Sequence, residues 1–512
     1  MNKNMILTAA LLGTALIALP GCNDDDVVIN NKDLDHTSQY LATEDEDSQS
    51  MYYKPYVGYC ADPMPFYDPA NKDFKVLYLQ DYLDNQQFTY HPIWGVSTKD
   101  GVSYTSLGEL ISCGAANELD AALGTGSTIY KDGVYYTFYT AHSPAPDKTG
   151  GINEAVMLAT SKDFSNWEKN RELIITGEGN YDTKDFRDPL VFQGEDGKYH
   201  LLIATKQNGK GVLADFISDN LLDWSDNGVF MTMMWDRFYE CPDIFKMGEW
   251  WYLLYSEQAD FMRKIQYFKG RTLEELKACT KDDAGIWPDY KEGILDSRGT
   301  YAGKTASDGT DRYLWGWNAR RNGFTNDNSY NWGGNLVMHK IIQHEDGTIS
   351  LGEVPAIANS FGNGTLMGDF SLSGEEFRLM PRLDRKNRIT FTVTTSNKEW
   401  DKFGVSFARG SDSDSYYTLV FNPENEESRK INFEREGAEP LFIDGSDSYW
   451  FPTPEDGVYN ITITNDNSVM TMYVNDNVAY TNRLYGMQRN CWSINSYGGN
   501  ITVSNLSVSS KN

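Results

Sequence analysis

The stretch KDGVYYTFYT at residues 131–140 joins a tight turn to a strand, and versions of it recur along the chain. Asp-Gly favours a short β-turn, and the aromatic and β-branched residues after it favour an extended strand. Four other stretches follow the same plan: NKDFKVLYLQ at 71–80, EDGKYHLLIA at 195–204, KMGEWWYLLYS at 246–256 and SDGTDRYLWGW at 307–317. Their turns follow one another at intervals of 52 to 64 residues. The pattern predicts five similar structural units.

A second phrase, with Ser, an acid and an aromatic residue, follows the earlier copies of the first. It reads STKDGVSY from Ser97, SKDFSNW from Ser161 and SDNLLDW from Ser218. Each unit therefore has room for four short antiparallel strands, and five such sheets hide their faces by packing radially. We predict a five-bladed β-propeller over residues 51–355.

The pattern of apolar and polar residues changes from about residue 365. Short segments now alternate apolar and polar residues, which is typical of an antiparallel sheet with one buried face. They include RITFTVTTS, FGVSFARG, YYTLVFNP, VYNITITND, SVMTMYVND and NITVSNLSVS. We predict a C-terminal β-sandwich over residues 365–512, so that the whole fold is all-β.

The charge balance excludes one class of partner. The chain of 512 residues has a formal net charge of −28, which repels phosphate backbones, so we expect no nucleic-acid binding. Aromatic residues make up 13% of the chain, and they suit either sheet cores or stacking on sugars.

The N-terminus has the pattern of an export signal. Residues 1–21 hold a Lys and a short apolar run, and the sequence LPGC at 19–22 resembles a bacterial lipoprotein box. This resemblance implies cleavage before Cys22 and lipidation of its thiol. Residues 22–50 are polar and acidic and are predicted to form a flexible tether. We expect a lipid-anchored protein of the outer membrane, on the cell surface or the periplasmic face, that meets the membrane only through Cys22.

No metal or cofactor site is predicted. The six His residues and the other five Cys residues show no HExxH, CxxC or similar ligand spacing, and no disulfide framework is indicated. The stretch GKTASDG at 303–309 lacks the upstream Gly and the Lys-Ser/Thr ending of a phosphate-binding loop.

Three acids share an unusual local form. Asp62 in YCADPMPFY, Asp188 in DTKDFRDPLVF and Glu240 in YECPDIFKM are each followed by Pro or Cys-Pro just before a strand-like run. Asp-Pro alone is a common turn, and a solvated charge pair is the ordinary reading of Arg187-Asp188. At matching positions in separate blades, however, the three acids are predicted to meet near the propeller axis.

These motifs resemble those of glycoside hydrolase family 32, which includes invertases, inulinases and levanases. RDP at Arg187 and ECP at Glu240, with an Asp-Pro early in the first blade, are similar to the three acidic motifs of the family. LYLQDYL, WGVSTKD, GTGST, TYAGKT and NWGG are similar to further family motifs. The resemblance covers most of residues 51–350 and implies a propeller followed by a sandwich.

The resemblance implies a retaining hydrolase of β-fructofuranosidic bonds in levan, inulin or fructo-oligosaccharides. It assigns nucleophilic attack to Asp62 and acid/base work to Glu240, whose carboxyl groups should then lie about 5–5.5 Å apart. Asp188 would hold the fructose hydroxyls, and Arg187 would neutralise part of the negative charge. Burial and neighbouring acids are expected to raise the pKa of Glu240. No cofactor is implied.

Four residues are expected to bind the substrate: Gln80, Thr125, Arg187 and Trp317. For Gln80, Thr125 and Trp317 the competing interpretation is packing within a blade. The nucleophile motif departs from the family, because Ala61 replaces its Asn and Met64-Pro65 replaces its Asn-Gly. The choice between levan, inulin and sucrose therefore stays open, as does endo or exo action.

Two other functions are compatible with the sequence. A five-bladed glycosidase acting on arabinan or xylan also uses three acids. A non-catalytic fructan-binding lipoprotein would fit the altered nucleophile motif, although such a protein has no need of a proton-donating Glu240.

Overall fold

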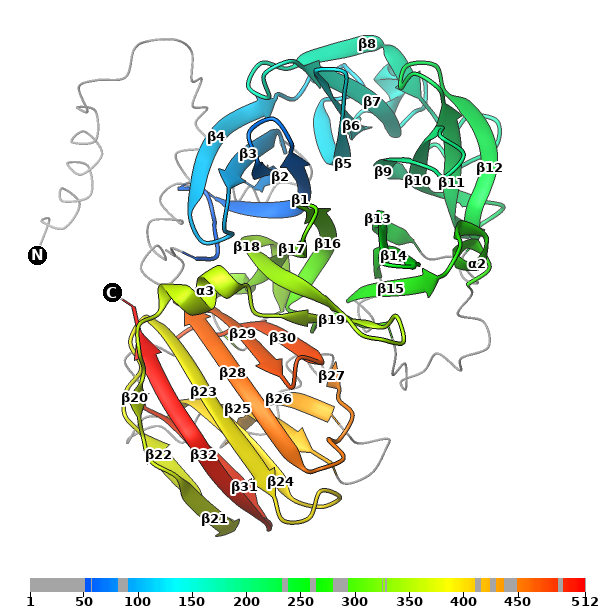
Figure 1. The fold of residues 1–512 in the computed structure, drawn as a ribbon. Helices are drawn as coiled ribbons and strands as arrows, with labels where there is room; N and C mark the ends of the chain where they lie inside the picture. Colours follow the sequence, from blue (N-terminus) through cyan, green and yellow to red (C-terminus); the bar gives the residue numbers. More distant parts are fainter. Residues whose placement is uncertain are drawn as a thin grey trace, which may run out of the picture.

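The computed structural model describes residues 51–56, 58–81, 91–232, 238–257, 264–279, 293–324, 326, 329–409, 416–423, 430–436, 449–486 and 491–511. The expected signal sequence, the tether and Cys22 lie outside these residues. The described chain is mostly β-structure and forms a ring of blades beside a two-sheet sandwich (Figure 1). The predicted fold class is therefore confirmed.

Five blades surround a central axis. From the axis outward they consist of β1 (Tyr59–Asp68), β2 (Asp73–Asp81), β3 (Ile93–Thr98) and β4 (Tyr104–Ile111); β5 (Ala122–Lys131), β6 (Val134–His142), β7 (Glu154–Ser161) and β8 (Glu168–Ile175); β9 (Phe186–Gln193), β10 (Tyr199–Gln207), β11 (Lys210–Ser218) and β12 (Ser225–Thr232); β13 (Tyr239–Met247), β14 (Trp250–Glu257) and β15 (Ile265–Gly270); β16 (Thr300–Ser307), β17 (Arg312–Arg321), β18 (Tyr330–Gln343) and β19 (Ile349–Gly352). The inner strands β1, β5, β9, β13 and β16 contact one another in a closed ring.

The blades differ in two details from the prediction. Among the described residues the fourth blade has three strands rather than four. The last and first blades also merge into one sheet, because β18 pairs with β1 at the single position Cys60 to Gly334. Short helices complete this part of the chain: η1 (Pro146–Lys148), α2 (Leu273–Lys277), η3 (Asn322–Phe324) and α3 (Pro355–Ser360).

The repeated aromatic phrase forms the second strand of every blade. Burial is uninterrupted from Tyr199 to Thr205 in β10 and from Trp251 to Glu257 in β14. A second strand has a neighbouring blade on each face, so both of its faces must be apolar or paired. The outermost strands β4, β8 and β12 are far more exposed.

The second phrase closes the turn before the outermost strand. Asp163 Oδ1 accepts hydrogen bonds from the backbone of Ser165 and Asn166, and Asn220 Oδ1 does the same for Leu222 and Asp223. These side chains replace backbone partners that a tight turn leaves unpaired. The recurrence of Ser-acid-aromatic in the sequence therefore reflects a repeated turn.

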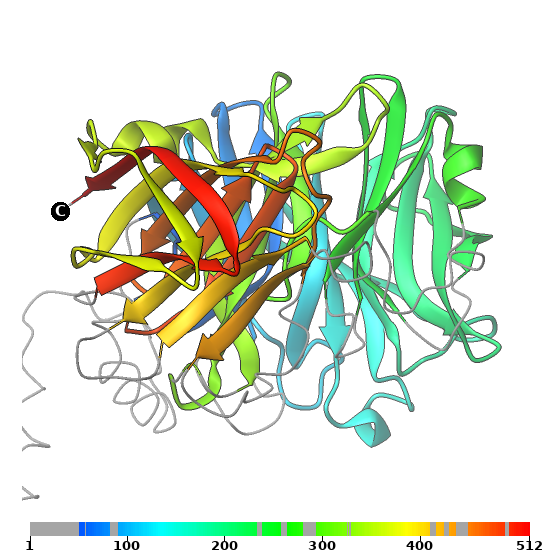
Figure 2. The same cartoon turned by 90° about the horizontal axis from the view of Figure 1, so that it is seen from below.

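The sandwich packs a seven-stranded sheet on a six-stranded sheet. Its strands are β20 (Thr365–Leu366), β21 (Phe370–Gly374), β22 (Phe377–Met380), β23 (Lys386–Thr395), β24 (Lys402–Arg409), β25 (Tyr416–Asn422), β26 (Lys430–Glu436), β27 (Tyr449–Trp450), β28 (Val458–Asp466), β29 (Val469–Val474), β30 (Val478–Arg483), β31 (Cys491–Tyr497) and β32 (Gly499–Ser510). In β23 every second residue is buried, which places Ile389, Phe391 and Val393 in the core between the sheets. The views in Figures 1 and 2 show this sandwich lying against one side of the propeller.

A buried polar seam joins the two parts. Arg483 of the sandwich is fully buried and donates from Nη2 to the Asn318 carbonyl at 2.8 Å and to Asn335 Oδ1 at 2.5 Å. His339 of the propeller pairs through Nδ1 with the Tyr473 hydroxyl at 2.8 Å. Buried groups with partners on both sides hold the two parts in a fixed register.

Within the described ranges, no helix is both long enough and apolar enough to cross a membrane.

Candidate active site

Every inner strand has a β-bulge near the axis. In β1 the pairing with β2 shifts between Ala61 and Met64, and equivalent shifts affect β5, β9, β13 and β16. The bulged residue has a positive φ in four blades: 46° at Asp62, 57° at Asp188, 50° at Cys241 and 53° at Ala302. A bulge bends its strand and redirects its side chains, so a bulge can aim a residue of each blade at a common site.

A sequence signal accompanies the bulges. The residue after the bulge centre is always Pro or Gly, namely Pro63, Gly126, Pro189, Pro242 and Gly303. Pro donates no ladder hydrogen bond and Gly allows close backbone approach, so both are tolerated where regular pairing stops.

The three acids lie within β1, β9 and β13, a little after each strand begins, and not before the strands as expected. Asp62 and Asp188 occupy the positive-φ position, whereas Glu240 stands one residue earlier and Cys241 takes that position. The prediction of matching positions is therefore wrong by one residue for Glu240. Glu240 corresponds instead to Arg187 in the neighbouring blade, and these two side chains meet.

Asp62 is held by donors from two other blades. Thr125 Oγ1 donates to its Oδ2 at 2.9 Å, and Trp317 Nε1 donates to its Oδ1 at 3.1 Å. Burial, reinforced by the negative charge of Asp188, raises the pKa of Asp62 to about 7, while the two hydrogen bonds act in the opposite direction.

Asp188 is fixed through its backbone and its side chain. Its N–H donates to Thr140 Oγ1 at 2.9 Å, and its Oδ2 accepts from the Cys241 N–H at 2.8 Å. Only 4% of Asp188 is exposed, so contacts with neighbouring blades, and not with solvent, fix the orientation of this carboxylate.

Glu240 lies between a cation and a phenol. Arg187 Nη2 donates to its Oε1 at 3.1 Å, and the Tyr301 hydroxyl donates to its Oε2 at 2.5 Å. Burial raises the pKa of Glu240; Arg187 opposes this shift and Asp188 adds to it. The expected direction is therefore confirmed, although Arg187 and Tyr301 limit its size.

One pocket of about 390 Å³ contains all three acids. Its wall also includes Thr125, Thr140, His142, Glu154, Arg187, Cys241 and Tyr301, together with His91 and Trp332. The His91 and Trp332 rings stack at a centroid distance of 4.3 Å. The pocket thus combines several carboxyl groups with an aromatic surface, an arrangement that suits a sugar.

The four residues expected to bind substrate differ in their relation to this pocket. Thr125 and Arg187 line the pocket, but Gln80 and Trp317 are not among the described residues of its wall. Both are buried, at 1% and 0% exposed, because they belong to second strands packed between blades. Trp317 donates a hydrogen bond to Asp62, and its ring lies beside the Tyr301 and Trp332 rings of the pocket wall, at centroid distances of 6.1 and 6.2 Å. Direct sugar contact by Gln80 and Trp317 stays a prediction.

The sequence analysis did not single out His91, His142, Glu154 or Tyr301 as site residues. Tyr301 could have been found from the bulge signal, because it stands two residues before Gly303 as Glu240 stands two before Pro242. His142 and Glu154 lie at the end of β6 and the start of β7, positions without such a signal.

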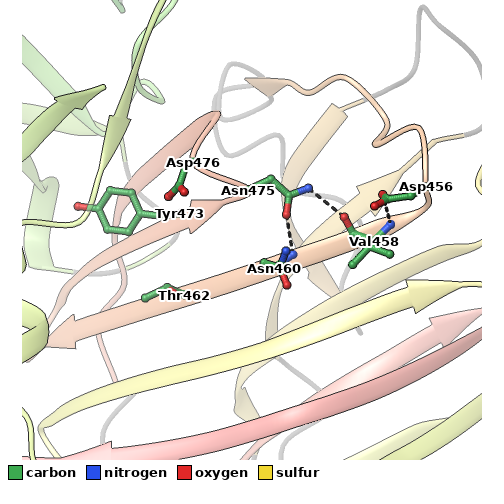
Figure 3. A pocket seen from close by; sticks show the side chains of 7 residues that line it. All are labelled: Asp456, Val458, Asn460, Thr462, Tyr473, Asn475 and Asp476. Carbon is green, nitrogen blue, oxygen red and sulfur yellow. Dashed lines mark hydrogen bonds between the residues drawn. The ribbon is translucent and has the colours of Figure 1, made fainter. Parts of the chain in front are cut away.

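Two other cavities have different characters. One of about 270 Å³ surrounds the axis on the side of Lys304 and Asp243. The other, of about 300 Å³, lies over β28 and β29 of the sandwich (Figure 3). There Asn475 accepts from the Asn460 N–H and donates to the Val458 carbonyl, so its amide fastens the two strands together.

The described residues contain no group of three or more His, Cys, Asp or Glu side chains placed to hold a metal ion.

Comparison with family models identifies both parts of the chain. Residues 52–355 match the glycosyl hydrolases family 32 N-terminal domain, and residues 347–508 match the GH32, BT1760-like, C-terminal domain. The chain belongs to glycoside hydrolase family 32. The resemblance seen in the motifs is therefore confirmed, and members of this family are glycoside hydrolases.

Individual relatives in family 32 are distant. Sucrose-6-phosphate hydrolase of Escherichia coli is 27% identical over 189 residues, which cover 34% of this chain and 38% of that protein. The structure of sucrose-6-phosphate hydrolase from Lactobacillus gasseri superposes with a TM-score of 0.73 at 17% identity, covering 94% of this chain and 96% of that one. Fructan 1-exohydrolase IIa from Cichorium intybus, solved with 1-kestose, also gives 0.73, at 15% identity with coverage of 91% and 97%. The aligned segment thus spans well under half of the curated relative, while the shared fold extends over nearly the whole chain.

Proposed function

We propose that this protein hydrolyses β-fructofuranosidic bonds in fructans such as levan, inulin or fructo-oligosaccharides, with retention of configuration. Asp62 attacks the anomeric carbon, Glu240 protonates the leaving oxygen and later activates water, and Asp188 holds hydroxyls of the fructose ring. The observation that carries the proposal is the meeting of these three acids from three blades in one pocket with different hydrogen-bond partners.

The partners suit the proposed roles. Both oxygens of Asp62 accept hydrogen bonds from neutral donors, which orient the carboxylate and favour its ionised form for attack. Glu240 is half-buried in a pocket that also holds Asp62, Asp188 and Glu154, which favours the protonated form that a general acid requires. Fructoside cleavage passes through an oxocarbenium-like state, and the acids around it supply compensating negative charge.

The family relatives support the substrate class. They include sucrose-6-phosphate hydrolases, a raffinose invertase of Escherichia coli and a fructan 6-exohydrolase of Beta vulgaris. All are named for fructose-containing substrates. The linkage and length that this protein prefers are part of the test.

The decisive experiment incubates the protein, without residues 1–21, with levan, inulin, sucrose and arabinan, and identifies the products by chromatography. We expect fructose or fructo-oligosaccharides from at least one fructan and nothing from arabinan. NMR of the first product should show the retained β configuration. Release of arabinose would favour the arabinan- or xylan-active alternative instead.

Asp62→Asn separates the enzyme from a binding protein. It keeps the shape of the side chain and removes the negative charge, so turnover should fall by several orders of magnitude while fructan binding stays measurable. Asp132→Asn, in an exposed turn with positive φ where Asn is well tolerated, is the matched control. If wild type and Asp62→Asn bind fructan equally and neither cleaves it, the non-catalytic lipoprotein is the better account.

The location is proposed from the LPGC sequence alone: a lipid on Cys22 anchors the protein to the outer membrane. Cys22→Ala should leave the protein unlipidated and move it from the membrane fraction to the soluble fraction. Mass spectrometry of the mature N-terminus checks the modification directly, and a soluble, unmodified wild-type protein would refute the anchor.

A further inference from the structure

A fourth carboxylate lies in the pocket wall without a role in the proposed reaction. Glu154 begins β7 and is only 8% exposed. Its Oε2 accepts from Arg187 Nη1 at 3.1 Å and from the Phe186 N–H at 2.8 Å. Its Oε1 faces His142 Nδ1 at 3.5 Å. Glu154 thus contacts the arginine that contacts Glu240.

The guanidinium of Arg187 donates hydrogen bonds to three acids. Its Nη1 donates to Glu154 at 3.1 Å and to Asp185 at 2.9 Å, while its Nη2 donates to Glu240 at 3.1 Å. The plane of the group lies over the Phe238 ring, 4.4 Å from its centroid. Arg187 therefore gives Glu240 one hydrogen bond and not the paired bonds of a bidentate fork, which are stronger.

This division resolves a conflict in the proposed chemistry. A general acid must hold its proton, but an arginine paired only with Glu240 would favour the ionised carboxylate. Glu154 holds the guanidinium through Nη1 and shares its positive charge. Less of that charge is then available to Glu240, which favours the protonated acid.

We propose that Glu154 is a positioning residue that holds Arg187 so that only one of its nitrogens reaches Glu240, which leaves Glu240 protonated and able to donate to the leaving oxygen. The inference rests on the proposed function of the pocket. It concerns the tuning of the acid and not contact with the substrate.

Other charged and titratable groups around this pair come from each neighbouring strand. Arg187 and Glu240 are surrounded by Asp62 on β1, His142 on β6, Asp185 before β9, Asp188 on β9, Lys206 on β10, Cys241 on β13 and Tyr301 on β16. Glu154→Gln leaves these side chains unchanged and retains an oxygen that can accept from the Phe186 N–H. Its effect therefore reports on the charge of Glu154.

The test is the pH dependence of kcat/KM for Glu154→Gln on the best fructan. We expect the basic limb, where Glu240 loses its proton, to move to lower pH by roughly 1 unit. KM should change little, and a fructoside whose leaving group departs without a proton should be cleaved almost normally. Glu172→Gln, on the exposed surface of β8, is the matched control and should leave the profile unchanged. An unchanged or upward-shifted basic limb in Glu154→Gln overturns the proposal.

A second readout does not depend on turnover. A water-soluble carbodiimide reacts with protonated carboxyl groups, and mass spectrometry of the peptide that contains Glu240 gives its labelling at each pH. Labelling should fade at lower pH in Glu154→Gln than in wild type, whether or not either protein cleaves fructan. If wild type cleaves nothing but the labelling midpoint still shifts, the proposed function fails and the contact is upheld; if it cleaves fructan and the midpoint stays, only the positioning role fails.

Glu154→Asp is the control that separates loss of charge from altered packing. It keeps the charge with a shorter reach, so the basic limb should stay closer to that of wild type than in Glu154→Gln. A larger shift in Glu154→Asp than in Glu154→Gln would mean that packing, and not charge, is responsible.

Discussion

Asp62 accepts hydrogen bonds from two side chains of other blades, and these bonds oppose the effect of burial on its pKa. Without them the carboxyl group would hold its proton more tightly, and a protonated carboxyl cannot attack. Trp317, also expected to meet the sugar, supports the proposed nucleophile through its hydrogen bond to Asp62.

Trp317→Phe should expose this support. Loss of the indole N–H raises the pKa of Asp62 further, so the acidic limb of kcat/KM, where Asp62 must ionise, moves to higher pH by roughly 1 unit. Activity at pH 6 should fall more than activity at pH 8. The comparison is Trp315→Phe, an equally buried Trp on the same strand whose Nε1 donates to the Tyr104 hydroxyl. Equal profiles for the two variants would contradict the role of Trp317.

For single residues, the sequence predicted which acids meet in the pocket better than it predicted the side chains that hydrogen-bond to them. Asp62, Asp188 and Glu240 carry the Pro signal of a bulge, which is local and visible. The pairing of Arg187 with Glu154, or of Tyr301 with Glu240, depends on which blade tilts toward which, and a linear pattern does not contain that information. The assignment of Gln80 and Trp317 to the sugar rests on motif resemblance, and a motif does not tell which way a side chain faces.

The bulged inner strand is the element that builds the pocket. Its positive-φ position is costly for a residue with a side chain, by about 1–3 kcal/mol, and four blades carry a non-Gly residue there. Two of these residues are the acids Asp62 and Asp188. The strain is therefore tolerated where it directs a carboxylate into the pocket.

Ala302 tests this interpretation without touching an acid. Its φ is 53°, so Ala302→Gly should leave thermal stability unchanged or slightly higher, whereas the β-branched Ala302→Val should lose about 2 kcal/mol or more. Thermal unfolding of the two variants gives the comparison. A stable Ala302→Val protein would show that the bulge can rearrange at little cost.

At the scale of elements, the repeated turn-plus-aromatic phrase correctly predicted a strand in each of the five blades, and the structure shows it to be the second strand. The prediction worked because burial on both faces forces a nearly continuous apolar run. The alternation in RITFTVTTS at 388–396 and VYNITITND at 458–466 likewise predicted sandwich strands. The merging of the last blade with the first was not predictable, because it rests on the single backbone pair of Cys60 and Gly334.

The molecule as a whole depends on the contact between its two parts. Val469 packs in a hydrophobic cluster of the propeller, and Tyr473 and Ala479 pack in another. These contacts add to the polar seam around Arg483. The sandwich therefore contributes directly to the stability of the blades nearest to it.

Cutting the chain near residue 360 should lower solubility and the midpoint of thermal unfolding more than it alters bond preference, because the acids all lie in the propeller. The ratio of products from levan and inulin, measured beside the unfolding curve, separates the two effects. A truncated protein that unfolds like the full chain but prefers a different linkage would argue against this division.

The first described residues are tied to the last part of the chain. The Met51 N–H donates to Asp466 Oδ2 across 415 positions of sequence, and the Tyr52 hydroxyl pairs with Thr471 across 419. During synthesis these partners emerge only after the whole propeller has been made. The segment before the first blade can pair with Asn335 and Leu336 once the last blade is made, but its contacts with the sandwich must wait for the end of translation. These contacts should be among the latest and slowest to form in folding.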